Sequence, residues 1–169
     1  LFQYAGMSFV DFAHLKERNI KNGILDYNRQ KTGTPMRLEI LDTAELMRKE
    51  LMGDKRPASG YLFPFLSGTK TGYEAYLEYN AALSRFNRNL KALKKAAGIA
   101  SDVTSYTIRH SFAMALKEQN VPIEMISELL GHKSIKTTQI YLRSFSLEKM
   151  TEVNSTCFGC VYNYVSKVG

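Results

Sequence analysis

Apolar residues recur every three or four positions along much of the chain, which predicts a mainly helical protein. The longest such stripe ends before Gly98, a residue typical of a helix C-terminus. Its members are Tyr76, Tyr79, Leu83, Phe86, Leu90, Leu93 and Ala97. Ser8 suits the N-cap of an earlier helix from Phe9 to about Lys16. Similar patterns predict helices over 42–52, 106–119, 122–130 and 134–141, and residues 1–7 read as the end of another helix.

Two segments follow a strand pattern instead. Residues 23–29 and 35–41 flank Gly33, and together they predict a β-hairpin with Lys31 at or beside its tip. Residues 53–68 read as a loop whose apolar run, Tyr61–Leu66, is expected in the core. We therefore expect an α+β fold, mainly helical, with a small antiparallel sheet.

Composition narrows the class of protein. The chain has 169 residues, 44% of them hydrophobic, which suits one domain with a real core. No apolar run approaches the ~18 residues of a membrane span. Because the chain starts at Leu1, we expect it to be a fragment of a longer protein. Its two cysteines, Cys157 and Cys160, make no disulfide framework, which favours a cytoplasmic protein.

The charge balance points to a polyanionic partner. Lys and Arg number 23 against 16 acidic residues, giving a net charge of +7. The segment between Tyr79 and Ser101 has no acidic residue but includes several basic ones, Arg85, Arg88, Lys91 and Lys95. This basic face is either an ordinary solvated helix surface or a surface that follows a nucleic-acid backbone.

Three short segments carry the candidate chemistry: Tyr106–Phe112, Leu130–Ser134 and Gln139–Tyr141. They supply Arg109, His132, Lys133 and the Tyr141 hydroxyl, without a carboxylate cluster that would hold a metal. Cationic donors stabilise the charge that develops when a phosphodiester is attacked, and a tyrosine hydroxyl can form the covalent intermediate. We therefore expect neither a metal nor another cofactor.

These segments resemble the signature of the tyrosine recombinases, the phage integrase family. The similar stretches are Tyr106-x-x-Arg109-His-Ser-Phe-Ala, Glu128-Leu-Leu-Gly-His132-Lys-Ser-Ile and Thr137-Thr-Gln-Ile-Tyr141. The Gln30-Lys31-Thr-Gly hairpin resembles the family's β-turn lysine, and Gly6–Asp11 resembles integrases of conjugative transposons. The resemblance implies a catalytic domain over residues 1–150, normally preceded by a DNA-binding domain that is absent here.

The resemblance also implies a role for each residue. Tyr141 attacks a DNA phosphate to form a 3′-phosphotyrosyl link, Arg109 and His132 hold the transition state, and Lys31 protonates the departing 5′ oxygen. Tyr106 replaces the family's usual histidine. His110 and Ser8 lie at positions that could border the site, and Lys133 joins the DNA-binding residues. Double-stranded DNA is the implied partner.

The implied assembly is a homotetramer on two DNA duplexes, with the free domain a monomer. Residues 151–169 form a tail that either exchanges between protomers or folds onto its own domain. Two other functions stay open. One is a nicking and closing enzyme similar to type IB topoisomerases. The other is a DNA-binding protein without full catalysis, since residues 122–141 also read as a helix-turn-helix.

One departure from the family pattern bears on activity. The first catalytic arginine belongs in the Gly6–Asp11 block, where Ser8 occupies its place, and the neighbouring Ala5 does not supply it either. Either another cation substitutes, with Arg18, Arg29 and Arg37 nearby in the sequence, or this copy is impaired.

Overall fold

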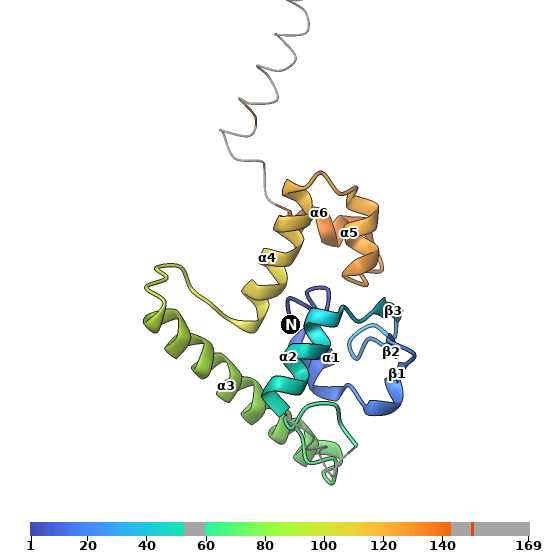
Figure 1. The fold of residues 1–169 in the computed structure, drawn as a ribbon, viewed down its shortest axis with the longest axis vertical. Helices are drawn as coiled ribbons and strands as arrows, with labels where there is room; N and C mark the ends of the chain where they lie inside the picture. The colour runs from blue at the N-terminus through green and yellow to red at the C-terminus, as the bar shows by residue number, and fades with distance from the viewer. Residues whose placement is uncertain (53–59, 143–149, 151–169) are drawn as a thin grey trace, which may run out of the picture.

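The computed structural model describes residues 1–52, 60–142 and 150, and it is mainly helical with one small sheet (Figure 1). This confirms the predicted fold class. In chain order the elements are α1 Phe9–His14, the 3-10 helix η1 Glu17–Asn19, β1 Ile20–Lys21, β2 Ile24–Asn28, β3 Pro35–Glu39, α2 Asp42–Met52, α3 Gly72–Ala96, α4 Ser105–Glu118, α5 Ile123–Leu129 and α6 Ile135–Tyr141.

The predicted hairpin is present as β2 and β3, which pair antiparallel from Ile24↔Glu39 to Asn28↔Pro35. Leu25 and Tyr27 are buried while Asp26 between them is exposed, so alternation fixes the register. Lys31 lies in the turn between the two strands and is exposed. A third strand, β1, pairs with β2 and was not predicted, because two residues carry no alternation that a sequence could reveal.

The expectation of a helix end over residues 1–7 is wrong. This segment forms turns, in which Ala5 and Gly6 have φ values of 50° and 63°. A Cβ at Gly6 would lie 2.6 Å from the Phe112 ring, so α4 packs directly on the Gly6 backbone. The turn, and not a helix, is what allows this close approach.

The largest core cluster lies around α1. Phe12 stacks on Phe63 with 4.0 Å between ring centroids, and Leu15, Leu25 and Leu62 are buried beside them. Leu62, Phe63 and Leu66 of the apolar run Tyr61–Leu66 are therefore core, as predicted, whereas Pro64 is exposed. Residues 53–59 of the same loop lie outside the described part of the chain. Helix α1, which borders the site, is therefore anchored in the core.

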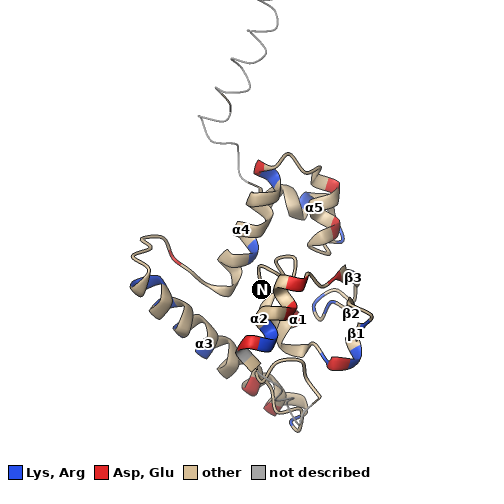
Figure 2. Ribbon diagram, in the orientation of Figure 1, with Lys and Arg blue, Asp and Glu red and all other residues tan. Residues whose placement is uncertain are grey.

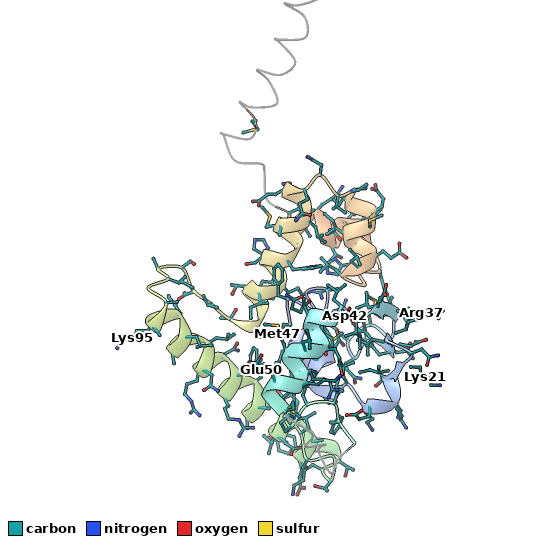
Figure 3. All side chains as sticks on the ribbon, in the orientation of Figure 1. Lys21, Arg37, Asp42, Met47, Glu50 and Lys95 are labelled. Atoms are coloured by element: carbon teal, nitrogen blue, oxygen red, sulfur yellow. The ribbon has the colours of Figure 1, made fainter. Side chains whose placement is uncertain are left out.

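Helix α3 starts earlier than its apolar stripe suggests and buries only part of that stripe. Tyr79, Leu83 and Phe86 pack near Phe9 in the second cluster, whereas Leu93 is 64% exposed. Tyr76 is also exposed. In Figure 1 the far half of α3 diverges from α4, and Figure 3 shows Lys95 at that far end. The helix is long because its sequence is uninterrupted, not because the core covers it.

Helices α4, α5 and α6 form the third part of the fold. The Thr104 hydroxyl accepts from the Thr107 N–H, and the Thr107 hydroxyl accepts from the Thr104 N–H, which caps α4. Pro122 and Ser134 stand at the N-cap positions of α5 and α6, one residue before each helix begins. Within the described residues, no helix is long and apolar enough to cross a membrane.

Candidate active site

A cleft of about 480 Å³ brings together residues from α1, the hairpin turn, α3, α4 and the α5–α6 region. Most of the residues predicted for catalysis line it, together with Ser8, a possible site residue, and Lys133, a predicted DNA-binding residue. The predicted catalytic residues in the lining are Arg109, His132, Lys31 and Tyr106. The cleft also contains Arg29, one of the three arginines considered as a substitute for the missing family residue.

Arg109 is held in a fixed orientation at the start of α4, where it is only 5% exposed. Its Nη1 donates to the Gly6 carbonyl oxygen at 2.9 Å, and its Nη2 donates to the Leu130 carbonyl oxygen at 2.5 Å. The same Nη2 lies 3.4 Å from His132 Nε2. The glycine turn at the N-terminus therefore serves to position this guanidinium.

Arg29 is also buried, immediately after β2, and is 8% exposed. Its Nε lies 3.2 Å from Asp11 Oδ2, and its Nη1 donates to the Gly131 carbonyl oxygen at 2.8 Å. Asp11 is 1% exposed and also accepts from Ser8 Oγ at 2.5 Å and from the Gln30 N–H at 2.7 Å. This buried carboxylate thus receives three donors, which fix Arg29 against it.

Gly131 is placed where a side chain would not fit. A Cβ there would lie 2.5 Å from Met36 Sδ and 2.6 Å from Arg29 Cδ, and its φ is 61°. The Gly131 turn ends α5, and the carbonyl oxygens of Leu130 and Gly131 accept from Arg109 and Arg29 respectively. Two consecutive carbonyls therefore set the positions of both arginines.

His132 follows this turn and is half-buried. Its Nδ1 lies 2.8 Å from Thr138 Oγ1, and its Nε2 faces Arg109. Burial lowers the pKa of His132 from 6.5 to about 4, and the positive charges of Arg109 and Arg29 act in the same direction. The ring is therefore neutral at pH 7 in the free protein.

The remaining predicted site residues are more exposed. Tyr106 is 60% exposed at the edge of the cleft, and Lys31 is exposed in the hairpin turn. The Ser8 hydroxyl is bound to Asp11 and does not cap α1. Tyr141 is the last residue of α6, and its side chain lies outside what the structure describes.

Several other predicted residues stand apart from the cleft. His110 is half-buried on α4 and is not among the residues that line the cleft. The lining also leaves out Arg18 and Arg37, the latter an exposed residue of β3 that is labelled in Figure 3. The basic residues Arg85, Arg88, Lys91 and Lys95 are exposed on α3, where Figure 2 shows basic residues without acidic ones along the far half of the helix.

Two residues of the site were missed by the sequence patterns. Asp11 was read only as part of a motif, although its spacing of three from Ser8 on one helix was a signal for their contact. Thr138 was read only as one of a pair of threonines, and nothing local marks it as the partner of His132. Within the described part of the chain, no group of three or more His, Cys, Asp or Glu side chains could hold a metal ion.

Comparison with known proteins gives consistent matches. The sequence model of the phage integrase family matches residues 1–148. A segment of 54 residues is 52% identical to tyrosine recombinase XerD of Lacticaseibacillus casei, covering 32% of this chain and 18% of that protein. A segment of 75 residues is 41% identical to tyrosine recombinase XerC of Rickettsia typhi, covering 44% and 24%. The chain thus matches about a quarter or less of these relatives' length.

Solved structures agree in fold. XerA recombinase has a TM-score of 0.67 at 23% identity, covering 92% of this chain and 54% of that chain. The Tn1549 transposon integrase, in complex with circular intermediate DNA, has a TM-score of 0.64 at 15% identity, covering 91% and 56%. XerH recombinase bound to its difH substrate has a TM-score of 0.56 at 21% identity, covering 89% and 42%.

Proposed function

Because the chain belongs to the phage integrase family, we propose that it is the catalytic domain of a site-specific DNA recombinase. The observation that carries the proposal is the cleft itself. Five cationic or imidazole side chains line one hollow beside the helix that ends at Tyr141: Arg29, Lys31, Arg109, His132 and Lys133. Such a set is complementary to the negative charge of a phosphodiester under attack.

In the proposed reaction the Tyr141 hydroxyl oxygen attacks a DNA phosphorus atom. A 3′-phosphotyrosyl bond forms while the bond to the 5′ oxygen breaks, and Lys31 gives that oxygen a proton. A bound phosphate would raise the pKa of His132 again, so the neutral ring can take up the proton that Tyr141 loses. A free 5′ hydroxyl from another strand reverses the step, which conserves the bond energy without ATP.

Arg29 takes the place of the missing family arginine in this proposal. Ser8 stands where that arginine belongs, and its hydroxyl binds the same Asp11 carboxylate that holds Arg29. Two of the five N–H donors of Arg29 are used by Asp11 and Gly131, which leaves donors for a phosphate oxygen. Arg18 and Arg37 lack this position, since neither lines the cleft.

The proposed substrate is double-stranded DNA in the bacterial cytoplasm, with the basic residues of α3 following its backbone. We propose that four copies act on two duplexes. Residues 151–169 lie outside the described structure, and deletion of residues 157–169 tests their part in assembly. A loss of cooperativity on DNA with an unchanged melting temperature would place their contact on a neighbour. A lowered melting temperature would place it on their own domain.

The experiment that tests the function is covalent trapping on a nicked suicide DNA substrate. The wild-type sequence, tested within the full-length protein, should form a protein–DNA adduct that survives denaturation. Tyr141→Phe should form none, whereas Tyr106→Phe, a matched change at an exposed edge residue, should retain the adduct at a reduced rate. Binding without any adduct would favour the non-catalytic alternative.

A second arm separates the recombinase from a nicking and closing enzyme. Two labelled duplexes that carry the same site should yield joined products if strands pass between them. Relaxation of supercoiled DNA without such joining would instead favour topoisomerase-like chemistry.

A further inference from the structure

Thr138 is the one residue of α6 whose buried hydroxyl contacts a cleft side chain in the described structure. It is 0% exposed, and its Oγ1 lies 2.8 Å from His132 Nδ1. Without this hydrogen bond, the buried hydroxyl would have no compensation for its removal from water. The hydrogen bond between Thr138 and His132 is therefore part of the buried structure of the site and not a surface contact.

The contacts on the two ring nitrogens of His132 determine where its proton lies. A guanidinium can only donate, so the Nε2 that faces Arg109 Nη2 must present a lone pair. In a neutral ring the proton then sits on Nδ1, from which it is donated to Thr138 Oγ1. Thr138 therefore acts as acceptor, and the reactive Nε2 points into the cleft without a proton.

We propose that Thr138 is a positioning residue, which fixes the Nδ1–H tautomer and the ring orientation of His132. The expected effect of Thr138 on the reaction rate rests on the proposed function, whereas its effect on the His132 tautomer does not. The Nδ1–H bond to Thr138 is present in both the neutral and the protonated ring, so the ring keeps its orientation when Nε2 gains or loses a proton.

The position of Thr138 in the chain gives this contact a second consequence. Thr138 lies three residues before Tyr141 on the same short helix, and its carbonyl oxygen accepts from the Leu142 N–H at 2.9 Å. The imidazole is thus tied to the helix that carries the nucleophile, and not only to its own loop. Movement of α6 would carry the orientation of His132 with it.

The tautomer is tested first, by nitrogen NMR of the free chain labelled in its three histidines, with His132→Asn to assign the signals. At pH 7.5 we expect His132 to show a protonated Nδ1 and an unprotonated Nε2. Thr138→Val should give a mixture of tautomers, and Thr138→Ser should restore the wild-type pattern. A protonated Nε2 in the wild-type protein, or an unchanged spectrum in Thr138→Val, would overturn the inference.

The effect on rate is tested by adduct formation on the suicide substrate. Thr138→Val should slow the step roughly 10- to 100-fold at unchanged DNA affinity, and Thr138→Ser should recover most of it. Thr43→Val, the same change at an exposed position of α2, should have no effect. In a His132→Asn background the further loss from Thr138→Val should nearly vanish. An equal loss in both backgrounds would mean that Thr138 acts on the fold and not through His132.

These outcomes separate the inference from the proposed function. If the wild-type protein forms no adduct but shows the Nδ1–H tautomer that Thr138→Val disturbs, the positioning role stands and the recombinase proposal fails. If the wild-type protein forms the adduct and Thr138→Val forms it as fast, the recombinase proposal stands and the positioning role fails.

Discussion

Replacement of Arg29 by alanine tests whether this arginine takes part in catalysis or only stabilises the fold. The change removes two interactions, the ion pair with Asp11 and the hydrogen bond to the Gly131 carbonyl oxygen. If Arg29 binds the reacting phosphate, removal of one such donor should slow cleavage by about 10²- to 10³-fold. DNA affinity should change much less, because many other phosphate contacts remain.

The same substitution lowers stability by an amount that must be measured separately. Breaking a buried ion pair by removing one partner typically costs about 3–5 kcal/mol. Asp11 keeps two donors, Ser8 Oγ and the Gln30 N–H, so we expect the lower end, about 3 kcal/mol. Thermal melts therefore accompany each rate, and the rates are compared at a temperature where every variant is folded.

The assay is adduct formation on the suicide substrate with two further variants. Arg37→Ala removes an exposed arginine from the same hairpin and should leave the rate unchanged. Ser8→Arg in the Arg29→Ala background restores a guanidinium beside the same Asp11 and should raise the rate at least about tenfold above that of Arg29→Ala. The reasoning is refuted if folded Arg29→Ala cleaves DNA as fast as wild type.

Three other predictions follow from the site. Lys31→Ala should be slow on a normal phosphodiester and largely rescued by a 5′-bridging phosphorothiolate, whose leaving group needs no proton; no rescue would limit Lys31 to an electrostatic role. Neutralising Arg88 and Lys91 should weaken binding to all DNA sequences alike. The slope of log affinity against log salt concentration should become less steep by about 0.9 for each phosphate that is no longer neutralised. Weaker binding to one sequence alone would instead indicate base readout. The free energy of unfolding should fall as the pH drops from about 6.5 towards 4, because the pKa of His132 is lowered to about 4 in the fold and the unfolded chain binds the proton more readily. Denaturant titrations should show this decrease, at most about 1–2 kcal/mol for a half-buried ring, and His132→Asn should remove that part of the pH dependence.

Local patterns predicted the elements that are stabilised by neighbours in sequence. The hairpin was predictable because Leu25, Asp26 and Tyr27 alternate in burial and Gly33 marks the turn. The end of α5 was predictable because Gly131 follows its last turn and adopts the positive φ, 61°, that glycine favours at helix C-termini. In both cases the signal that fixes the local structure lies within a few consecutive residues.

The sequence-based predictions were wrong for segments whose conformation depends on contacts with residues far away in the chain. The apolar spacing of residues 1–7 resembles a helix, but the segment turns because Gly6 packs on Phe112 and supplies a carbonyl to Arg109, 103 residues away. The exposed Leu93 could not be told from the partly buried Leu83, since the sequence of a helix does not reveal whether another element covers its apolar face. Periodicity shows that a face is apolar, and only the fold shows what covers it.

The choice among Arg18, Arg29 and Arg37 had the same limit. All three lie near the vacant position in sequence, and their ranking needs the contact between Arg29 and the Gly131 carbonyl oxygen, which spans 102 residues. A buried carboxylate was the missing clue. Asp11 on α1 is buried, and buried polar groups need partners, so its burial points to a donor such as Arg29 from the hairpin.

The turn after α5 contacts the two buried arginines of the candidate site and carries His132. The carbonyl oxygen of Leu130 holds Arg109 of α4, that of Gly131 holds Arg29 of the hairpin, and His132 contacts Thr138 of α6. Unpaired carbonyls at a helix C-terminus carry partial negative charge, so they hold two guanidiniums close together before any phosphate is present. A phosphate that enters the cleft therefore meets cations whose mutual repulsion has already been offset by the fold. The electrostatic work of assembling the site is done during folding, which is the condition under which fixed charges accelerate a reaction most.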